Sequence, residues 1–242
     1  MSAATQDRSE DLVIVTGASR GIGRATVRSL VFGHGAHVLA LARDVAALGS
    51  LVKECDSVTG AVELATVDLA DDTAVQLVLD RLAGRKVRAL IHNAGLLHTK
   101  PMGQHQQKDL DRLFRVNVTA PLLLSQALAD QLDGDPPGHV VHISSMGGFQ
   151  DSVKFPGLVG YSASKAALAC LSQCLAEEFR ERGIRSNCLA LGSVDTDMLR
   201  AAFPNYRASI TAEEMGGFIA EFSLRGHKLF NGKVLPVALA TP

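Results

Sequence analysis

The sequence predicts a doubly wound α/β fold, in which helices cover both faces of a seven-stranded parallel sheet. Apolar runs of strand length alternate with segments long enough for helices, which is the βαβ pattern. Most runs are almost continuously hydrophobic, as expected of strands covered on both sides. A glycine-rich turn separates the first run from the first helical segment. The expected strands are Leu12 to Val15, His37 to Leu41, Ala61 to Val67, Arg88 to His92, His139 to Ile143, Ser186 to Ala190 and Lys233 to Val237.

The last expected strand contains Pro236, which lacks the N–H that a central strand needs, so we place this strand at a sheet edge. The first helical segment extends to about Phe32. Later segments carry apolar residues at spacings of three and four, which predicts helices facing the core. The two clearest stripes are Leu110, Leu113, Asn117, Pro121, Leu124 and Leu128, and Leu168, Leu171, Leu175 and Phe179.

The chain has 242 residues, of which we expect 1–10 to be a flexible segment and 11–242 to be a single catalytic domain. A hydrophobic content of 47% supplies a sizeable core. The net charge of -1 gives no attraction to nucleic acid or to acidic membranes, so we expect neither as a partner. The apolar stretches are shorter than the roughly 20 residues that span a bilayer. Because the start lacks the layout of a signal peptide, the expected location is cytoplasmic.

Cysteine and histidine give no sign of a metal site. The four cysteines form no CxxC pair, so we expect buried reduced thiols rather than disulfides or zinc ligands. The eight histidines form no HExxH pattern, so we expect them to be structural or surface residues. No metal is therefore predicted.

The turn after the first strand reads Thr16-Gly17-Ala18-Ser19-Arg20-Gly21-Ile22-Gly23. Glycines let a backbone turn tightly and approach a pyrophosphate, whose charge the free N–H groups of a following helix stabilise. Taken alone, the same glycines also suit a tight turn that binds nothing.

Further motifs follow in a fixed order along the chain. They are Asp68 after the third strand, Asn93-Ala94-Gly95 after the fourth, Asn117 on the next helix, Ser144-Ser145 after the fifth, and Tyr161-Ser162-Ala163-Ser164-Lys165. With the Gly-x-x-x-Gly-x-Gly spacing, this series resembles the short-chain dehydrogenase/reductase (SDR) family of the classical type. The resemblance implies a Rossmann fold that binds NAD(P). It also implies that Asp68 and Leu69 contact the adenine, with Asn93 to Gly95 beside it.

Tyr161 and Lys165 are four residues apart, so they project from one face of a helix. A nearby ammonium favours the phenolate, so we expect Lys165 to lower the pKa of Tyr161 toward the working range. The alternative is an ordinary surface pair. The resemblance places the pair beside the nicotinamide, with Tyr161 as the proton donor or acceptor and Lys165 on the ribose.

Ser145 is predicted to hold the substrate oxygen, because a strand of an α/β sheet places ligands at its carboxyl end. In the family the catalytic serine precedes a small or apolar residue and a glycine, as Ser145 precedes Met146 and Gly147. Ser144 remains a minor contender. The interval from Ser145 to Tyr161 is longer than in many members, which predicts a longer loop, Phe149 to Gly160, over the substrate pocket.

Asn117 interrupts an apolar stripe, where an unpaired amide would cost free energy. It is interpreted as a hydrogen-bonded residue at a helix kink. In the family the matching Asn holds a water that links Lys165 to solvent, and the two roles are compatible.

Leu191 stands where the family usually has a proline. We expect the loss of that rigid residue to loosen the segment. The resemblance still places the nicotinamide carboxamide near Val194 and Thr196. The chain end also lacks the usual Asp-Gly-Gly after the last strand, which weakens an assignment as a fatty-acid-synthesis ketoreductase.

The choice of cofactor depends on the end of the second strand, Ala42-Arg43-Asp44. An NAD site needs a carboxylate there, and Ala42 occupies the expected position. Arg43 and Arg20 supply two guanidiniums for a 2′-phosphate, which predicts NADP(H). Alternatively, each arginine is a solvated surface residue. A one-residue shift in the register of the second strand would bring Asp44, a carboxylate, to the ribose instead.

We therefore expect an NADP(H)-dependent oxidoreductase that interconverts a carbonyl and a secondary alcohol, acting on a small molecule. Two alternatives are a catalytically silent NAD(P)-binding sensor of the same fold and an epimerase or dehydratase of the extended branch. The presence of Tyr161 and Lys165 argues against the first, and the short chain against the second. Apolar residues on more than one face of two helices (Leu122, Leu123, Ala169 and Cys170) predict a homo-oligomer, a tetramer or a dimer.

The substrate itself stays open at this stage. Its pocket is expected to be lined by Leu96 to Met102, Met146 to Phe155 and Ser193 to Tyr206, a mixture of apolar and polar side chains. Steroids, acyl thioesters, sugars and small ketones all remain candidates.

Overall fold

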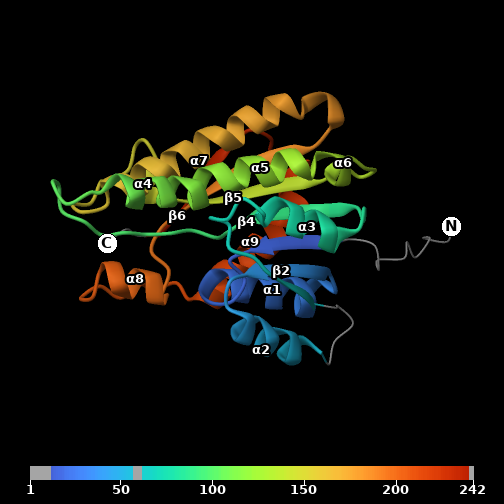
Figure 1. The fold of residues 1–242 in the computed structure, drawn as a ribbon, viewed down its shortest axis with the longest axis horizontal. Helices are drawn as coiled ribbons and strands as arrows, with labels where there is room; N and C mark the ends of the chain where they lie inside the picture. Colours follow the sequence, from blue (N-terminus) through green and yellow to red (C-terminus); the bar gives the residue numbers. More distant parts are fainter. Residues whose placement is uncertain (1–11, 57–61, 240–242) are drawn as a thin grey trace.

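The computed structural model describes residues 12–56 and 62–239. They form a seven-stranded sheet with the order β3-β2-β1-β4-β5-β6-β7, and every neighbouring pair is parallel (Figure 1). The doubly wound Rossmann fold predicted from the sequence is confirmed. The predicted flexible segment 1–10 and the first residue of the third expected strand, Ala61, lie outside the described residues.

The strands agree with the predicted runs to within two residues at each end. Their bounds are β1 Leu12–Thr16, β2 His37–Ala42, β3 Val62–Thr66, β4 Val87–His92, β5 His139–Ser145, β6 Arg185–Leu191 and β7 Val234–Val237. Pro236 lies in β7, which pairs only with β6 at the edge of the sheet, as predicted. Ser144 and Ser145 belong to β5 itself rather than following it.

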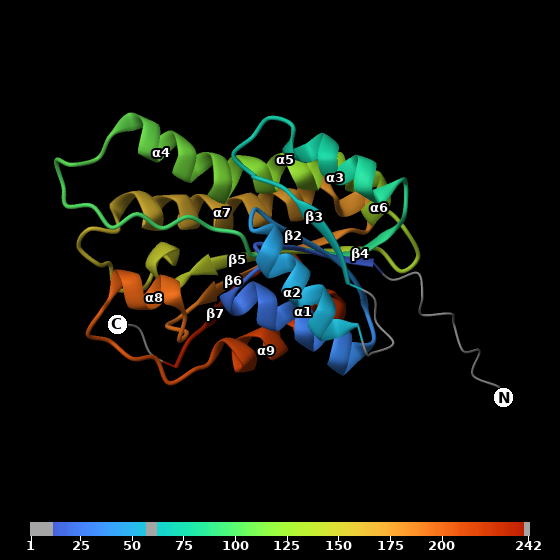
Figure 2. The same ribbon diagram turned by 60° about the horizontal axis from the view of Figure 1, so that its bottom comes forward.

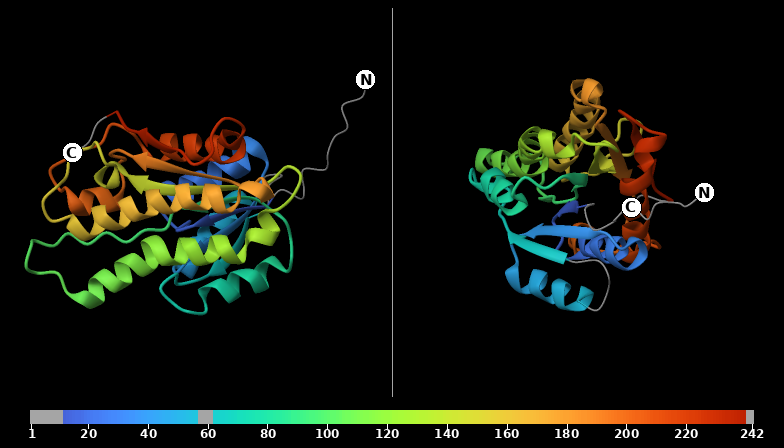
Figure 3. Two further views of the ribbon diagram at one scale, coloured as in Figure 1. Left: turned by 90° about the horizontal axis from the view of Figure 1, so that it is seen from above. Right: turned by 90° about the vertical axis from the view of Figure 1, so that its right-hand side faces the viewer.

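Successive strand residues point to opposite faces of the sheet, and each face has its own core. Val13 and Val15 pack with α1, α2 and α9, whereas Leu12 and Ile14 pack with α3, α5 and α7. Figure 3 shows the two helical layers on either side of the sheet. The helices are α1 Gly21–His34, α2 Val45–Cys55, α3 Ala74–Leu82, α4 Gln107–Phe114, α5 Ala120–Ala127, α6 Ala129–Leu132, α7 Val159–Glu178, α8 Asp197–Ala202 and α9 Ala212–Arg225.

The apolar stripe that starts at Leu110 does not form one continuous helix. A π-helical segment, Arg115–Thr119, joins α4 to α5 and contains Asn117. A π segment arises where one extra residue enters the helix, and it allows Asn117 to turn inward without breaking the stripe. The structure therefore shows a local change of helix type at Asn117, and the expected kink stays a prediction.

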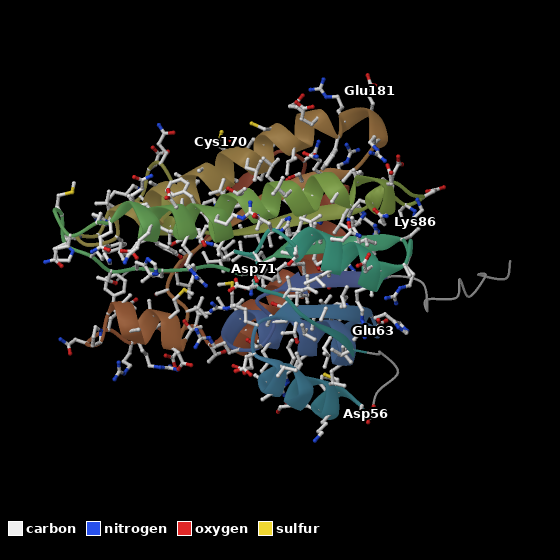
Figure 4. All side chains as sticks on the ribbon, in the orientation of Figure 1. Asp56, Glu63, Asp71, Lys86, Cys170 and Glu181 are labelled. Carbon is white, nitrogen blue, oxygen red and sulfur yellow. The ribbon has the colours of Figure 1, made fainter. Side chains whose placement is uncertain are left out.

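The prediction of four buried cysteines is wrong for two of them. Cys55 and Cys188 are buried, but Cys170 and Cys174 are exposed on α7. Figure 4 shows Cys170 on the side of α7 that faces away from the sheet. Ala169, expected on an exposed apolar face, is buried within the single chain, because it lies on the inner side of the same helix.

Within residues 12–56 and 62–239, no helix combines the length and the apolar character needed to cross a membrane.

Candidate active site

A cavity of about 630 Å³ runs along the carboxyl edge of the sheet. It is lined by residues at or just after the ends of β1, β2, β4, β5 and β6 and by the start of α8. The strand order reverses between β1 and β4, and this is where doubly wound sheets bind ligands. In Figure 2, α8 lies beyond the end to which β5 points. The cavity brings together all the site residues predicted from the sequence except Asn117, which is buried behind it.

The glycine turn forms the wall of the cavity beside β1. A Cβ on Gly23 would lie 2.2 Å from the carbonyl oxygen of Gly17, so no other residue fits there without displacing the backbone. Gly17 has a φ of 68°, and its Cβ would lie 2.8 Å from Cα of Ala94. The first turn of α1 has neither a side-chain cap nor an acidic residue. Gly21, Ile22 and Gly23 of this turn line the cavity, where their free N–H groups suit an anion.

Asn93 and Thr16 join the ends of β1 and β4. The Asn93 side-chain amide donates to the carbonyl oxygens of Thr16, at 3.0 Å, and Gly17, at 3.1 Å. In return, the Thr16 hydroxyl oxygen accepts from the backbone N–H groups of Asn93 and Ala94, each at 3.0 Å. The Asn-Ala-Gly motif thus fixes the glycine turn against the central sheet, while Ala94 and Gly95 line the cavity.

Charged side chains gather at the β2–β3 end. Arg43 is 57% exposed, and its Nη1 lies 3.8 Å from Oδ2 of Asp68, which Arg112 approaches to 3.1 Å. Asp44 lines the same end, but its Oδ1 accepts a hydrogen bond of 2.9 Å from the N–H of Ala47 and caps α2. Asp44 is the carboxylate that could bind the ribose of NAD instead, and one of its oxygens is therefore engaged at a helix terminus.

Tyr161 and Lys165 lie one turn apart on α7, and both are buried in the wall of the cavity. The Nζ of Lys165 lies 5.9 Å from the centre of the Tyr161 ring and donates to the carbonyl oxygen of Ile143 at 2.7 Å. Ser145, the last residue of β5, forms a hydrogen bond with Tyr161. The three predicted catalytic side chains thus meet at one point of the cavity.

The electrostatics of this group differ from the expectation. Burial raises the pKa of Tyr161, and the hydrogen bond with Ser145 opposes that rise only in part. Burial lowers the pKa of Lys165 to about 8. The expected lowering of the Tyr161 pKa by Lys165 is therefore wrong for the free protein. The physical reason is that burial removes water from the phenolate, whereas the ammonium is directed at a backbone carbonyl.

The two neighbouring serines have different partners. Both serines line the cavity, but Ser144 is buried and its hydroxyl donates to the carbonyl oxygen of Lys165 at 2.8 Å. Ser145 lies on the cavity side, and its Oγ also accepts from the N–H of Gly147 at 3.1 Å. This arrangement favours Ser145 as the residue that meets a substrate.

Asn117 is completely buried, and both polar atoms of its side-chain amide have hydrogen-bond partners. Its Oδ1 accepts from the N–H of Leu96 at 2.8 Å, and its Nδ2 donates to the Leu96 carbonyl at 3.0 Å and to Ser164 Oγ at 2.9 Å. The amide therefore ties the loop after β4 to α7. Its role in a proton relay stays a prediction.

Leu191, which stands where the family usually has a proline, belongs to a regular strand, and the expected loosening stays a prediction. It is the last residue of β6, pairs in register with Ser145 on one side and Val237 on the other, and is buried. Beyond it, the Thr196 hydroxyl accepts from Leu199 N–H at 3.2 Å and caps α8, while Val194 and Thr196 both line the cavity.

At the β5–β6 end of the cavity, the lining residues differ in part from the predicted ones. Residues 98–102 do not reach it, and Met102 is 79% exposed. The predicted loop ends at 158, because α7 begins at Val159, and only Phe155 and Leu158 of this loop contribute. Leu158 lies within the loop predicted to cover the pocket but outside the predicted lining, and Val67, next to Asp68, was not predicted. Neither apolar side chain carries a chemical signal in the sequence.

The family model of short chain dehydrogenases matches residues 11–207. The chain therefore belongs to this family of oxidoreductases.

Curated relatives and solved structures give the same class. The chain is 35% identical over 200 residues to the L-xylulose reductase of Caenorhabditis elegans, covering 81% of this chain and 77% of the relative. It is 34% identical over 189 residues to carbonyl reductase [NADPH] 2 of Sus scrofa, covering 78% and 73%. The structure of a blue fluorescent protein from a metagenomic library in complex with NADPH superposes with a TM-score of 0.82, at 29% identity and with 96% and 98% coverage.

Proposed function

We propose that this protein is an NADP(H)-dependent oxidoreductase that interconverts a carbonyl and a secondary alcohol. The observation that carries the proposal is the meeting of Ser145, Tyr161 and Lys165 at one point of a cavity that begins at an uncapped glycine-rich helix terminus. The names of the two relatives and the NADPH complex of the similar structure support the same reaction class.

The cavity fits a dinucleotide along its length. The turn from Gly17 to Gly23, with Ser19, Arg20, Gly21 and Ile22, would hold the pyrophosphate. Asp68 and Leu69 would contact the adenine, and Asn93, Ala94 and Gly95 would lie beside it. Tyr161 and Lys165 would bind the nicotinamide ribose, and Val194 and Thr196 the carboxamide. A Cβ on Gly95 would lie 3.2 Å from Nζ of Lys165, so this glycine keeps space beside the ammonium.

When bound in this cavity, the dinucleotide would supply the hydride, and with it the two electrons, for the carbonyl carbon. Ser145 holds the carbonyl oxygen, and Tyr161 donates its proton to that oxygen. Because burial raises its pKa, Tyr161 keeps its proton at neutral pH, which is the form that reduction needs. Lys165 then stabilises the phenolate left behind. Asn117 completes the path by which a proton returns from solvent.

The preference for NADP(H) over NAD(H) rests on the β2 end. Ala42 supplies no carboxylate at the end of β2, and one oxygen of Asp44 caps α2. The exposed guanidinium of Arg43, with Arg20 in the glycine turn, is suited to the charge-assisted hydrogen bonds of a 2′-phosphate.

The test is a panel of ketones, aldehydes and alcohols, assayed by the absorbance of NADPH and NADH, with cofactor binding measured in parallel. Turnover with NADPH that exceeds turnover with NADH supports the proposal. Binding of NADPH without turnover of any compound would favour a silent sensor. Failure to bind either dinucleotide would overturn the assignment.

We also propose a homo-oligomer, a tetramer or a dimer. The outer face of α7 exposes small side chains, Ala163, Ala166, Cys170 and Cys174, and Leu122 of α5 is 38% exposed. Light scattering at micromolar concentration should give a multiple of the 25.6 kDa chain mass. A monomer mass would contradict the proposal. The cytoplasmic location stays a prediction from the sequence.

A further inference from the structure

The cavity beyond Tyr161 is walled by apolar side chains from separate segments. Leu97 comes from the loop after β4, Met146 from the turn after β5, Phe155 and Leu158 from the loop before α7, and Met198 and Phe203 from α8 and its end. Burial of an apolar ligand against such a wall favours binding. A ligand rich in hydroxyl groups would lose its hydrogen bonds to water there without gaining new ones from the wall.

Two of the charged side chains around this end, Asp197 and Lys100, form ion pairs. Asp197, which lines the cavity, accepts from Arg200 at 2.8 Å, and this bond lowers the pKa of its carboxyl, with a smaller contribution from Arg20 of the glycine turn. Lys100, in the loop beside Leu97, pairs with Asp109. The ammonium of Lys100 and the guanidinium of Arg200 are therefore engaged by carboxylates of the protein and are not directed at an acidic substrate.

Hydroxyl groups at this end are also engaged. Ser193 lines the cavity, and its Oγ lies 2.9 Å from the hydroxyl of Tyr206, which is not a lining residue. The hydroxyl groups of Ser145 and Tyr161 are hydrogen-bonded to each other where the substrate carbonyl would lie. The polar groups therefore suit one oxygen atom, the carbonyl oxygen itself, rather than a chain of hydroxyls.

Two aromatic rings from separate segments are in contact. The ring centres of Phe155 and Phe203 lie 5.3 Å apart with an interplanar angle of 75°. This edge-to-face geometry is the one that aromatic pairs prefer, and a third ring can join it. Both side chains are half-buried and line the cavity.

We propose that the substrate is an uncharged ketone whose body is an apolar ring system, and that Phe155 and Phe203 determine specificity by packing against that ring. This inference rests on the proposed carbonyl reduction and names its substrate class. It excludes sugars and acidic substrates, although one relative is named for a ketose.

The experiment compares kcat/KM at saturating NADPH for three ketones: 1-tetralone, which has a fused apolar ring, the ketose xylulose, and an anionic 3-oxo acid. We expect 1-tetralone to exceed the other two by about a hundredfold or more, since a site without matching polar groups rejects hydroxyls and charge. A ketose or an anion reduced equally well would overturn this inference and leave the proposed function standing. If none is reduced, calorimetric titration of 1-tetralone and xylulose into the protein–NADP⁺ complex decides, and preferential binding of xylulose or binding of neither would overturn it. Absence of NADPH binding marks instead a failure of the proposed function.

Two variants test the aromatic pair. Phe155→Ala and Phe203→Ala should each raise KM for 1-tetralone about tenfold, change kcat by less than about twofold, and leave KM for butanone unchanged, because only the ring contact is lost. Phe32→Ala is the matched control, since Phe32 is 46% exposed on α1 and lies outside the cavity lining. Equal changes for both ketones, or none, would overturn the role of the pair, and thermal unfolding of each variant separates a general loss of stability from a lost contact.

Discussion

The end of the cavity beside β1 and β2 is built from backbone groups and charged side chains, whereas the end beside β5 and β6 is built from apolar side chains. At the first end, glycines bring N–H groups to the surface of the cavity, and exposed arginines stand near its rim. At the second end, aromatic and aliphatic side chains meet from segments far apart in sequence. Tyr161 and Lys165 lie at the junction.

The two ends of the cavity suit two ligands of different chemistry. A phosphate-bearing ligand is bound by dipoles and charges whose positions depend on a short, local motif. An apolar ligand is bound by shape and burial, which depend on how several loops pack together. Substitutions at the first end should therefore affect the dinucleotide, those at the second end the ketone, and those at the junction the chemistry.

The largest effect is expected at the junction. Tyr161→Phe removes the oxygen that carries the proton, and kcat should fall by about 10² to 10⁴. Binding of NADPH should persist, because only one ribose contact is lost. Steady-state rates and a fluorescence titration of NADPH measure the two properties separately. Retention of more than about a third of the wild-type rate would remove Tyr161 from the mechanism.

The second effect concerns the glycine turn. In Gly23→Ala the new Cβ would meet the Gly17 carbonyl at 2.2 Å, so the turn must open, and NADPH affinity should fall by about a hundredfold, equal to about 2.7 kcal/mol. Gly33→Ala, on the same helix, is the control, since its Cβ meets only Ser29 Oγ at 3.8 Å. That variant should bind NADPH normally and gain about 0.5–1 kcal/mol in the free energy of unfolding. Equal affinities in the two variants would mean that the turn does not bind the dinucleotide.

The third effect separates the two dinucleotides. Arg43→Ala removes a guanidinium suited to the 2′-phosphate, so NADP affinity should fall about ten- to a hundredfold, equal to about 1.4–2.7 kcal/mol, with NAD affinity nearly unchanged. Titrations of both cofactors into wild type and variant measure this. Tighter NAD binding by the wild type, or equal losses for both cofactors, would refute the NADP preference.

The smallest effect is a pH dependence at the junction. The pKa of Lys165 is about 8, so the ammonium that would hold the ribose is present below this pH and is lost above it. The affinity for NADPH should therefore fall by up to about tenfold per pH unit above pH 8. Lys165→Arg keeps its charge and should show a flatter profile. A wild-type affinity that stays constant from about pH 7 to pH 9.5 would contradict the prediction.

Local sequence patterns predict the parallel sheet, the edge position of β7 and the glycine turn. Continuous apolar runs predict strands that are covered on both faces, and Pro236 cannot join a central strand. The glycines at fixed spacing form a tight turn, in which only glycine fits at position 23. The assembly of Ser145, Tyr161 and Lys165 was predicted through the resemblance to a family, because their separation along the chain gives no distance in space.

Properties that depend on burial and on contacts between distant segments arise only in the folded chain. Burial reversed the expected pKa shift of Tyr161, since loss of water from the phenolate outweighs the nearby ammonium. The inward and outward faces of α7 decided that Ala169 is buried and Cys170 exposed. The meeting of Phe155 with Phe203, on which the substrate inference rests, depends on how two loops pack, and periodicity within either segment carries no information about it.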